Sequence, residues 1–491
     1  MSRIRANTIT NQNANGAPNF PDGITVSGVV TATVSSSTLG TLAVTGNATV
    51  GGTLGVGGVL TYEDVTNVDS IGIITARAGV NVVGNDLNVG SNIKLGNASG
   101  IITATSYRGD ASQMTGAGLG TDGSANTSGI ITATAFVPTV GQLSHRNLII
   151  NGDMQVAQRG TSSTSNGYKT VDRITPYTDN IGVTATYSQV DVTSGGAYDA
   201  GFRKAWQVTK GAGTANTNSQ VNMGYKIEAQ DIANSGWKYT DPNSYITISF
   251  WLKTSVSNHN PQLLVLDQDS STSSTKNYFV DIPALTANTW TKITHSIPGH
   301  ADQVYNSDNG TGLEFQIIAW YGTDYTDAGN TPNAWGSFGT KPVNTTWLTT
   351  NSSTFQVTGM QLEVGPVATP FEHRSFSEEI RQCMRYYEKS FQYPDAPANG
   401  SYSTTGGGGA VFSRSHNNSN VGKIQFKVEK RANPGLTFYG NGSGYWYSPS
   451  TGYHQHNSVA NGPDRTGFYP RQQASGSIID VQGHYAADAE L

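Results

Sequence analysis

A short sequence that recurs along the first part of the chain most constrains how this protein can fold. SGVVTAT begins at Ser27, IGIITAR at Ile71, SGIITAT at Ser99 and a second SGIITAT at Ser128. The copies are unevenly spaced, which argues against a single-chain solenoid with coils of fixed length. Three identical chains around one axis tolerate uneven spacing, because symmetry completes each layer. We therefore expect residues 26–144 to form an elongated trimeric β shaft.

The residues between the copies support this interpretation. Apolar side chains alternate with Thr, Asn or Gly, and Gly-Gly and Gly-Asn pairs mark tight turns. The alternating positions are Leu42, Val44, Val50, Leu54 and Val56, and then Val82, Leu87, Val89, Ile93 and Leu95. Such thin strands cannot bury their apolar face within one chain, so we expect them to stack on other chains.

The Arg108-Gly109-Asp110 triplet lies inside this repetitive region. It follows the third copy, where a repeat strand ends in a Gly-Asp-Ala-Ser bend, and the other copies lack it. Because Gly and Asp are favoured in such a bend, we interpret the triplet as a turn and not as an adhesion signal.

Residues 145–375 have the pattern of an all-β sandwich. Longer strands separated by polar loops are predicted at 245–253, 289–297, 312–321 and 355–365. In the first strand, Ile246, Ile248, Phe250 and Leu252 share a core face and Trp251 points away. In the third, Leu313, Phe315 and Ile317 share a face from which Trp320 is excluded. The alternation slips at Gly359, which predicts a β-bulge.

A short helix and a small β domain are expected to complete the chain. Ser375 and Glu378 form a capping box before a predicted linker helix at 376–390. Its apolar stripe consists of Ile380, Cys383, Met384 and Tyr387. Residues 391–491 are again rich in Gly and Tyr, and we expect a C-terminal β tip domain there.

Several segments resemble phage tail-fibre proteins. They are NLIINGDMQVAQRG from Asn147, SFWLKTS from Ser249 and MQLEVGPVATPFEHRSFSEEIRQCMRYYEKS from Met360. The GIITAT and YRGDASQMTG repeats are similar to shafts of fibres from marine phages that infect cyanobacteria. The resemblance implies a jelly-roll sandwich like a carbohydrate-binding module, in a homotrimeric virion appendage. It transfers no individual sugar-binding residue.

Composition and motifs exclude several other classes. The net charge is −5 with no block of Lys or Arg, so no nucleic acid partner is expected. The chain starts without an apolar signal segment and has no run long enough to span a bilayer. We therefore expect synthesis in the host cytoplasm, no membrane insertion and assembly into the virion. No catalytic, phosphate-binding or zinc motif is present, so no enzyme activity, cofactor or metal is predicted.

Aromatic side chains are the candidates for glycan binding, because they stack on sugar rings while amides and carboxylates bind hydroxyls. The sandwich candidates are Trp251, Trp320, Tyr321, Tyr325, Trp335 and Trp347. The tip candidates are Tyr445, Trp446, Tyr447 and Tyr453. Because the distal end of a fibre meets the host first, we expect the tip to set host choice and the sandwich to add weaker contacts.

The segment of residues 1–25 is expected to attach the fibre to a phage tail or baseplate protein. Arg3 and Arg5 would pair with acidic residues, and Ile4 and Ile9 would supply apolar contacts. Two alternatives stay open for the whole chain. One is a polysaccharide depolymerase with loop carboxylates such as Asp324 and Asp327 or Asp480. The other is a structural virion fibre that binds no host. His454 and His456 would share a strand face, but we expect them to be solvated and not to bind a metal.

Overall fold

The computed structural model divides the chain into two compact units, residues 1–129 and 130–491. The structure describes residues 7–10, 13, 18, 20–22, 25–27, 43–58, 71, 87–89, 93–95, 102–104, 145–269, 276–327, 329–344, 346–400, 411–416, 419–420, 422–440, 446–448, 452–454, 458–459, 462–471 and 479–491. The expectations for Arg3, Ile4, Arg5 and the Arg108-Gly109-Asp110 triplet therefore fall outside the described residues.

The first unit contains a small antiparallel sheet of β1 (Leu87–Val89), β2 (Ile93–Leu95) and β3 (Ile102–Ala104). Leu87 pairs with Leu95 and Val89 with Ile93, so β1 and β2 are antiparallel neighbours. β3 lies inside the SGIITAT copy that starts at Ser99 and pairs with β2. The alternating apolar pattern thus gives strands here, as the sequence predicts.

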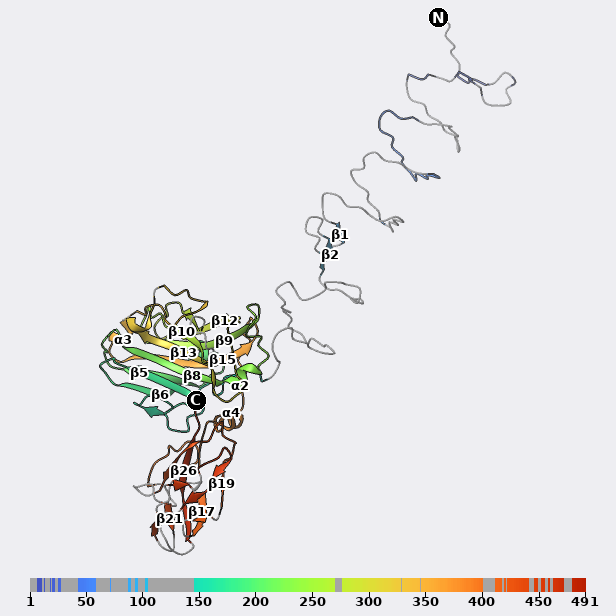
Figure 1. Ribbon diagram of the computed structural model, residues 1–491. Helices are drawn as coiled ribbons and strands as arrows, with labels where there is room; N and C mark the ends of the chain where they lie inside the picture. The colour runs from blue at the N-terminus through green and yellow to red at the C-terminus, as the bar shows by residue number, and fades with distance from the viewer. Residues whose placement is uncertain are drawn as a thin grey trace. The chain divides into compact units, whose positions relative to one another are not determined.

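The second unit begins with a β-sandwich of two six-stranded sheets (Figure 1). We call the sheet with the order β14-β11-β10-β13-β8-β5 the platform sheet. Its strands are β5 (Ile174–Asp179), β8 (Gln220–Glu228), β10 (Gln262–Asp267), β11 (Asn277–Asp281), β13 (Thr311–Tyr321) and β14 (Trp335–Gly336). The back sheet has the order β12-β9-β15-β7-β6-β4. Its strands are β4 (Ser162–Ser163), β6 (Ala185–Asp191), β7 (Lys204–Lys210), β9 (Tyr245–Thr254), β12 (Thr291–Pro298) and β15 (Ser353–Val364). The four long strands predicted from the sequence are confirmed.

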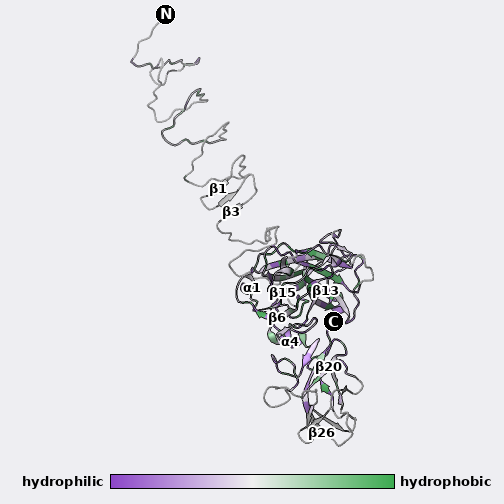
Figure 2. Cartoon of the chain, turned by 90° about the vertical axis from the view of Figure 1, so that its left-hand side faces the viewer, coloured by the Kyte–Doolittle hydropathy of each residue, from purple (hydrophilic) through white to green (hydrophobic). Residues whose placement is uncertain are grey.

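The inner faces of the two sheets form one core. Ile246, Ile248, Phe250 and Leu252 of β9 have no exposed surface, and Phe315 of β13 lies in the same cluster. Figure 2 shows hydrophobic residues along the sandwich strands with hydrophilic ones between them. Trp251 points away from this core and is half-buried, as its position in the alternation predicts.

Two irregularities in the strands decide which side chains face outward. β15 shifts register between Thr358 and Gln361, which confirms the bulge predicted at Gly359. Gly359 has a φ of 64°, and a Cβ there would lie 2.5 Å from the Phe202 ring, so the bulge requires glycine. A second shift, between Ile318 and Trp320 of β13, is not predicted by the sequence.

The short helices lie at the ends of strands. They are α1 (Gly196–Asp199), α2 (Ala229–Ala233), α3 (Thr346–Thr349), the 3-10 turn η2 (Thr323–Tyr325) and α4 (Phe376–Cys383). The Ser375 side chain accepts a hydrogen bond from the Glu378 amide at 3.3 Å and caps α4 as predicted. The helix is shorter than expected, because residues 387–389 form β16 (Tyr387–Lys389) and pair with the last strand of the chain. Among the described residues, no helix is long and apolar enough to cross a membrane.

The C-terminal β domain is organised around its last strand, β26 (Ile479–Asp488), which pairs with four other strands. The partners of β26 are β16, β17 (Val411–His416), β20 (Gly435–Tyr439) and β21 (Trp446–Ser448). The remaining strands are β18 (Ser419–Asn420), β19 (Ile424–Gln425), β22 (Gly452–His454), β23 (Ser458–Val459), β24 (Gly467–Phe468) and β25 (Pro470–Arg471). Phe426, Phe468 and Tyr485 form a small core there.

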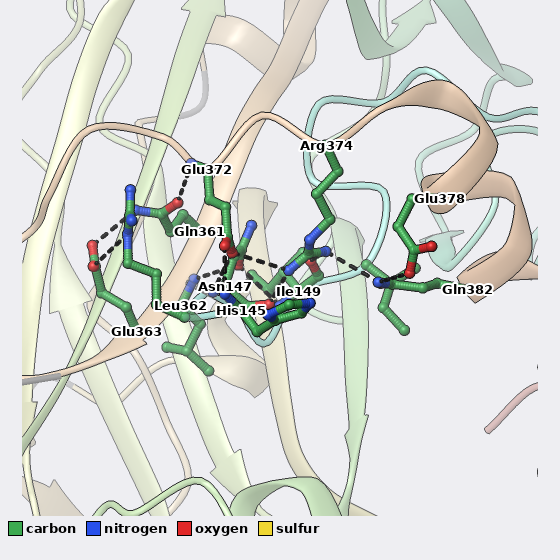
Figure 3. A network of polar contacts seen from close by, with 12 residues as sticks. His145, Asn147, Ile149, Gln361, Leu362, Glu363, Glu372, Arg374, Glu378 and Gln382 are labelled. Atoms are coloured by element: carbon green, nitrogen blue, oxygen red, sulfur yellow. Dashed lines mark hydrogen bonds and ion pairs between the residues drawn. The ribbon is translucent and has the colours of Figure 1, made fainter. Parts of the chain in front are cut away.

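Two of the segments that carry the tail-fibre resemblance, the one from Asn147 and the one from Met360, fold against each other around Arg374 (Figure 3). Its guanidinium donates to the main-chain oxygens of Asn147 and Ile149 and contacts Glu372 and Glu379. Glu372 in turn accepts the amide hydrogens of His145 and Asn147, at 2.6 and 2.9 Å. The motif after β15 therefore fastens residues 145–150 to the sandwich, which is a structural role.

A junction of buried charges joins the sandwich to the C-terminal domain. The Arg173 guanidinium, 1% exposed, pairs with Glu490 and stacks 3.5 Å from the centre of the Tyr386 ring. Glu228 at the end of β8 accepts hydrogen bonds from Arg385 at 2.7 and 2.8 Å and from Tyr386 at 2.6 Å. Because unpaired charges are costly to bury, these pairs hold the two domains in one arrangement.

Candidate glycan-binding face

The outer face of the platform sheet presents an aromatic and polar surface. In β5, Ile174 and Pro176 point inward, so Thr175 and Tyr177 point outward. Tyr177 pairs with Asn222 of β8, whose register partner in β13 is Ile318. Tyr177 is 44% exposed, so part of its side chain is accessible to a ligand.

A chain of hydrogen bonds crosses this face next to Tyr177. The Asn222 amide donates to the Tyr321 hydroxyl at 3.2 Å, and that hydroxyl donates to Gln316 Oε1 at 2.7 Å. Gln316 Nε2 donates to Glu314 Oε1 at 2.7 Å, and Gln268 Nε2 donates to Glu314 Oε2 at 2.8 Å. These bonds fix the direction of each amide and carboxyl group before any ligand arrives.

Tyr325 extends the aromatic surface from the loop after β13. Its hydroxyl accepts a hydrogen bond from Gln220 Nε2 at 2.9 Å, and its ring lies 5.3 Å from that of Tyr321 at 45°. The turn η2 can pack closely against residues 216–217 because residue 322 is glycine. A Cβ at Gly322 would lie 2.2 Å from the main-chain oxygen of Thr217.

Electrostatics keep the tyrosines of this face uncharged. Burial raises the pKa of Tyr325, and the nearby Asp179, Tyr177 and Asp324 raise it further. Burial and Glu314 raise the pKa of Tyr321 as well. Both phenols keep their protons at neutral pH. The Tyr321 proton is donated to Gln316, whereas the Tyr325 hydroxyl accepts from Gln220 Nε2 and can donate its own proton to a ligand.

A hollow of about 510 Å³ continues from the end of β5 toward the neighbouring edge of the back sheet. Asp179 belongs to both the hollow and the platform face, and Asn166, Asn180 and Tyr187 line its other sides. An exposed ring, oriented amides and carboxylates, and an adjoining polar hollow are the groups that sugars require.

The structure brings two of the predicted sandwich residues, Tyr321 and Tyr325, together on this side of the sheet. Tyr321 is only 4% exposed and belongs to the core cluster, so it supports the face from beneath, and Tyr325 is the one that solvent reaches. Trp320 is a correction, because the bulge after Ile318 turns it into the core, where it is 3% exposed. Trp347 is a second correction. It is fully buried in α3 and stacks on His259 with 5.3 Å between ring centres.

Trp335 and Trp251 are half-buried and serve in packing. Trp335 lies 5.3 Å from the Tyr278 ring, and its Nε1 donates to the Pro298 oxygen at 2.8 Å. Trp251 on the outer face of the back sheet is covered by α1, since a Cβ at Gly196 would lie 2.7 Å from its ring. Both tryptophans lie apart from Tyr321 and Tyr325 in the sheets, which the sequence could not reveal.

The predicted tip site is also partly corrected. Trp446 is fully buried, and a Cβ at Gly483 would lie 2.3 Å from its ring, so Trp446 is a core residue of the C-terminal domain. Tyr447 and Tyr453 pair across β21 and β22, but their side chains lie outside the described residues. Tyr445, His456 and the His454 side chain also lie outside them. At the other end of the chain, Ile9 is 57% exposed.

Several residues of the face were missed from the sequence. Tyr177, Asn222, Gln220 and Gln316 lie on three strands whose order in the sheet is not visible in the sequence. The clearest signal was at Tyr177, because ITPYTD alternates and places this aromatic residue on the side opposite to Ile174 and Pro176. Asn222 and Gln220 share the alternation of β8 in the same way, but polar outward residues are common in any strand.

The described loop carboxylates already have partners within the chain. Asp324 accepts from the Thr217 hydroxyl at 3.2 Å, and Asp327 accepts the Gly329 amide hydrogen at 2.8 Å within its own turn. Within the part of the chain that the structure describes, no group of three or more His, Cys, Asp or Glu side chains is arranged to hold a metal ion.

No protein-family model matches the sequence, and no curated protein matches it. Solved structures similar to the chain include the enzymatically active domain of tailspike protein 4 of bacteriophage CBA120, at 12% identity and a TM-score of 0.23. That match covers 45% of this chain and 21% of the tailspike domain. A xylan-binding domain from Paenibacillus barcinonensis matches at 11% identity and a TM-score of 0.24, over 47% of this chain and 100% of the domain. A putative sugar binding protein from Bacteroides thetaiotaomicron matches at 12% identity and a TM-score of 0.24, over 45% of this chain and 100% of its own.

Proposed function

We propose that this chain is a phage tail-fibre protein that attaches to a glycan on the host surface through the outer face of its platform sheet. The observation that carries the proposal is the exposed Tyr177 ring beside the oriented chain from Asn222 to Glu314. A sugar ring on Tyr177 would place its hydroxyls against donors and acceptors that are already fixed. The resemblance of the sequence to tail fibres supplies the setting in a virion.

We further propose that three copies assemble through the repetitive region. In the described part of that region, Val44, Val50, Leu54 and Val56 are between 46% and 65% exposed in a single chain. These are the alternating apolar positions, and burying them against two other chains would remove that surface from water. The segment of residues 1–25 is proposed to bind a tail or baseplate protein. Light scattering of the purified full chain should give three times the mass of 51.9 kDa, and a monomer would contradict this part.

Binding is tested with the full chain on an immobilised panel of neutral and acidic bacterial surface polysaccharides. We expect retention on at least one polysaccharide and its loss in Tyr177→Ala. The matched control is Tyr198→Ala, because Tyr198 is similarly exposed at 38% but lies on α1, away from the platform sheet. Equal loss in both variants, or retention in both, would contradict the proposed face.

Two further measurements on the same polysaccharides and on host cells separate the alternatives. New reducing ends on a polysaccharide incubated with the protein would favour a depolymerase. Retention on no polysaccharide and on no host cell would favour a structural fibre that binds no host. Avidity makes the proposed weak contacts sufficient, because three copies of a millimolar site can engage one surface together.

A further inference from the structure

A second cavity lies between the sandwich and the C-terminal domain. Its volume is about 330 Å³, which is near the lower end for small-ligand sites, so it has room for one sugar ring and not for a long oligosaccharide. Both domains line it. The sandwich contributes Ser162 and Ser163 of β4 and the exposed Lys169, and the C-terminal domain contributes Thr437, Tyr439 and Asp488.

The wall from the C-terminal domain offers an aromatic ring beside hydroxyl and carboxylate groups. Thr437 and Tyr439 are two residues apart on β20 and therefore share one face. The Tyr439 ring is held edge-to-face against Phe391 with 5.4 Å between ring centres. Burial raises the pKa of Tyr439, so its hydroxyl stays neutral and can both donate and accept.

Arg159 and Tyr387 also line this cavity, and their contacts fix its charges. The Arg159 guanidinium lies 3.7 Å from the centre of the Tyr387 ring and pairs with Asp488 at 3.0 Å and Glu490 at 3.3 Å. Arg159 is largely buried, but the Asp488 side chain is 50% exposed. The ion pair with Arg159 thus fixes the position of Asp488, which lines the cavity and is half-exposed.

We propose that this cavity binds a single neutral hexopyranose unit of a glycan, as a composite site made by both domains. The Tyr439 ring would cover the apolar face of the sugar, and Asp488 and Lys169 would accept from and donate to neighbouring hydroxyls. Ser162, Ser163 and Thr437 supply further hydroxyl groups that suit either role. The inference does not depend on the platform face, since no residue lines both sites.

The test uses the full chain carrying Tyr177→Ala, so that the contribution of the platform face is reduced. Saturation-transfer difference NMR is measured with methyl α-glucopyranoside, methyl α-mannopyranoside, methyl α-galactopyranoside and N-acetylglucosamine. Ser162→Trp fills the cavity from the sandwich wall, and Thr437→Trp fills it from the C-terminal wall. Ser165→Trp is the matched control, because Ser165 is exposed just after the end of β4 but does not line the cavity.

We expect transfer to at least one of the four sugars, its loss in both cavity-filling variants, and full transfer in Ser165→Trp. Absence of transfer to all four sugars would overturn the proposal. Retained transfer in either cavity-filling variant would overturn the composite site, because the sugar would then bind without the wall that the tryptophan blocks. If a tryptophan variant has a lower melting temperature, Tyr439→Ala replaces it and should lose transfer, with Tyr439→Phe retaining most of it. Binding by Tyr439→Ala equal to wild type would also contradict the site.

Discussion

The domain junction and the platform face contain the same kinds of side chain, but these side chains have different roles in the two places. At the junction, Arg173 and Glu490 are almost without exposed surface and satisfy each other. On the platform face, Tyr177 is open to solvent, and the carboxyl of Glu314 lies in a chain of amides that already points outward. Charged and aromatic groups that are buried hold the molecule together, and those that remain exposed are free to meet a ligand. Burial, and not residue type, separates the two roles.

Removing one charge from the junction should have the largest effect. In Glu490→Ala, Arg173 stays buried without its carboxylate, so we expect a loss of about 3–5 kcal/mol in the free energy of unfolding. Urea unfolding measures this. The control is Glu429→Ala, whose carboxylate forms an exposed ion pair with Arg465 and should contribute at most about 1 kcal/mol. Equal losses in the two variants would remove the distinction between buried and exposed pairs.

Acid should weaken the same junction. Burial alone would raise the pKa of Glu228, but hydrogen bonds from Arg385, Tyr386 and Gln230 outweigh it and lower the pKa. A carboxyl with a lowered folded-state pKa stabilises the protein above its unfolded value, and that stability is lost as pH falls through the folded value. We therefore expect the melting temperature to fall below about pH 4.5, near the unfolded pKa of a glutamate.

The control for the pH dependence of the melting temperature is Glu228→Gln, because the glutamine side chain does not carry a negative charge at any pH. Its stability should be lower than wild type at pH 7, and its fall with acid should be shallower. A fall as steep as that of wild type would assign the acid sensitivity to other carboxyls.

On the platform face, a substitution should change binding and leave stability almost unchanged. Tyr177→Ala removes the exposed ring, and we expect about tenfold weaker glycan binding, which is ~1.4 kcal/mol, since stacking on an aromatic side chain contributes about this much. Its melting temperature should change little, because Tyr177 is 44% exposed and lies on the outer side of the sheet. A large loss of stability in Tyr177→Ala would make the ring a packing residue and erase the contrast with the junction.

The smallest effect is expected at the start of the hydrogen-bonded chain. Asn222→Ala removes the donor to the Tyr321 hydroxyl, which should cost about 1 kcal/mol of stability for one buried hydrogen bond. Binding should weaken as well, because Tyr321 then loses one of the contacts that orient it. Thermal unfolding and the polysaccharide assay are measured together. Unchanged binding in Asn222→Ala would mean that the hydrogen-bonded chain does not contribute to binding and that the aromatic rings alone form the site.

Much of the fold followed from local pattern. Period-two alternation predicted β9, β12, β13 and β15 and the inward face of β9, because successive side chains of a strand point to opposite sides. The slip of that alternation also revealed the bulge at Gly359. The same rule failed at Trp320, because the bulge after Ile318 leaves no mark in the local sequence.

By itself, therefore, the sequence determined four long strands of the sandwich, the cap of α4 at Ser375 and the repetitive character of the first unit, all of which depend on neighbours along the chain. The tertiary structure decided which aromatic residues are available. Trp347 and Trp446 are buried by partners far away in the sequence, and Tyr177, Asn222 and Tyr321 are joined by the order of strands in one sheet. It also decided that Glu490 pairs with Arg173. The physical reason is that exposure and pairing depend on contacts between distant residues, which no local pattern of residue types contains.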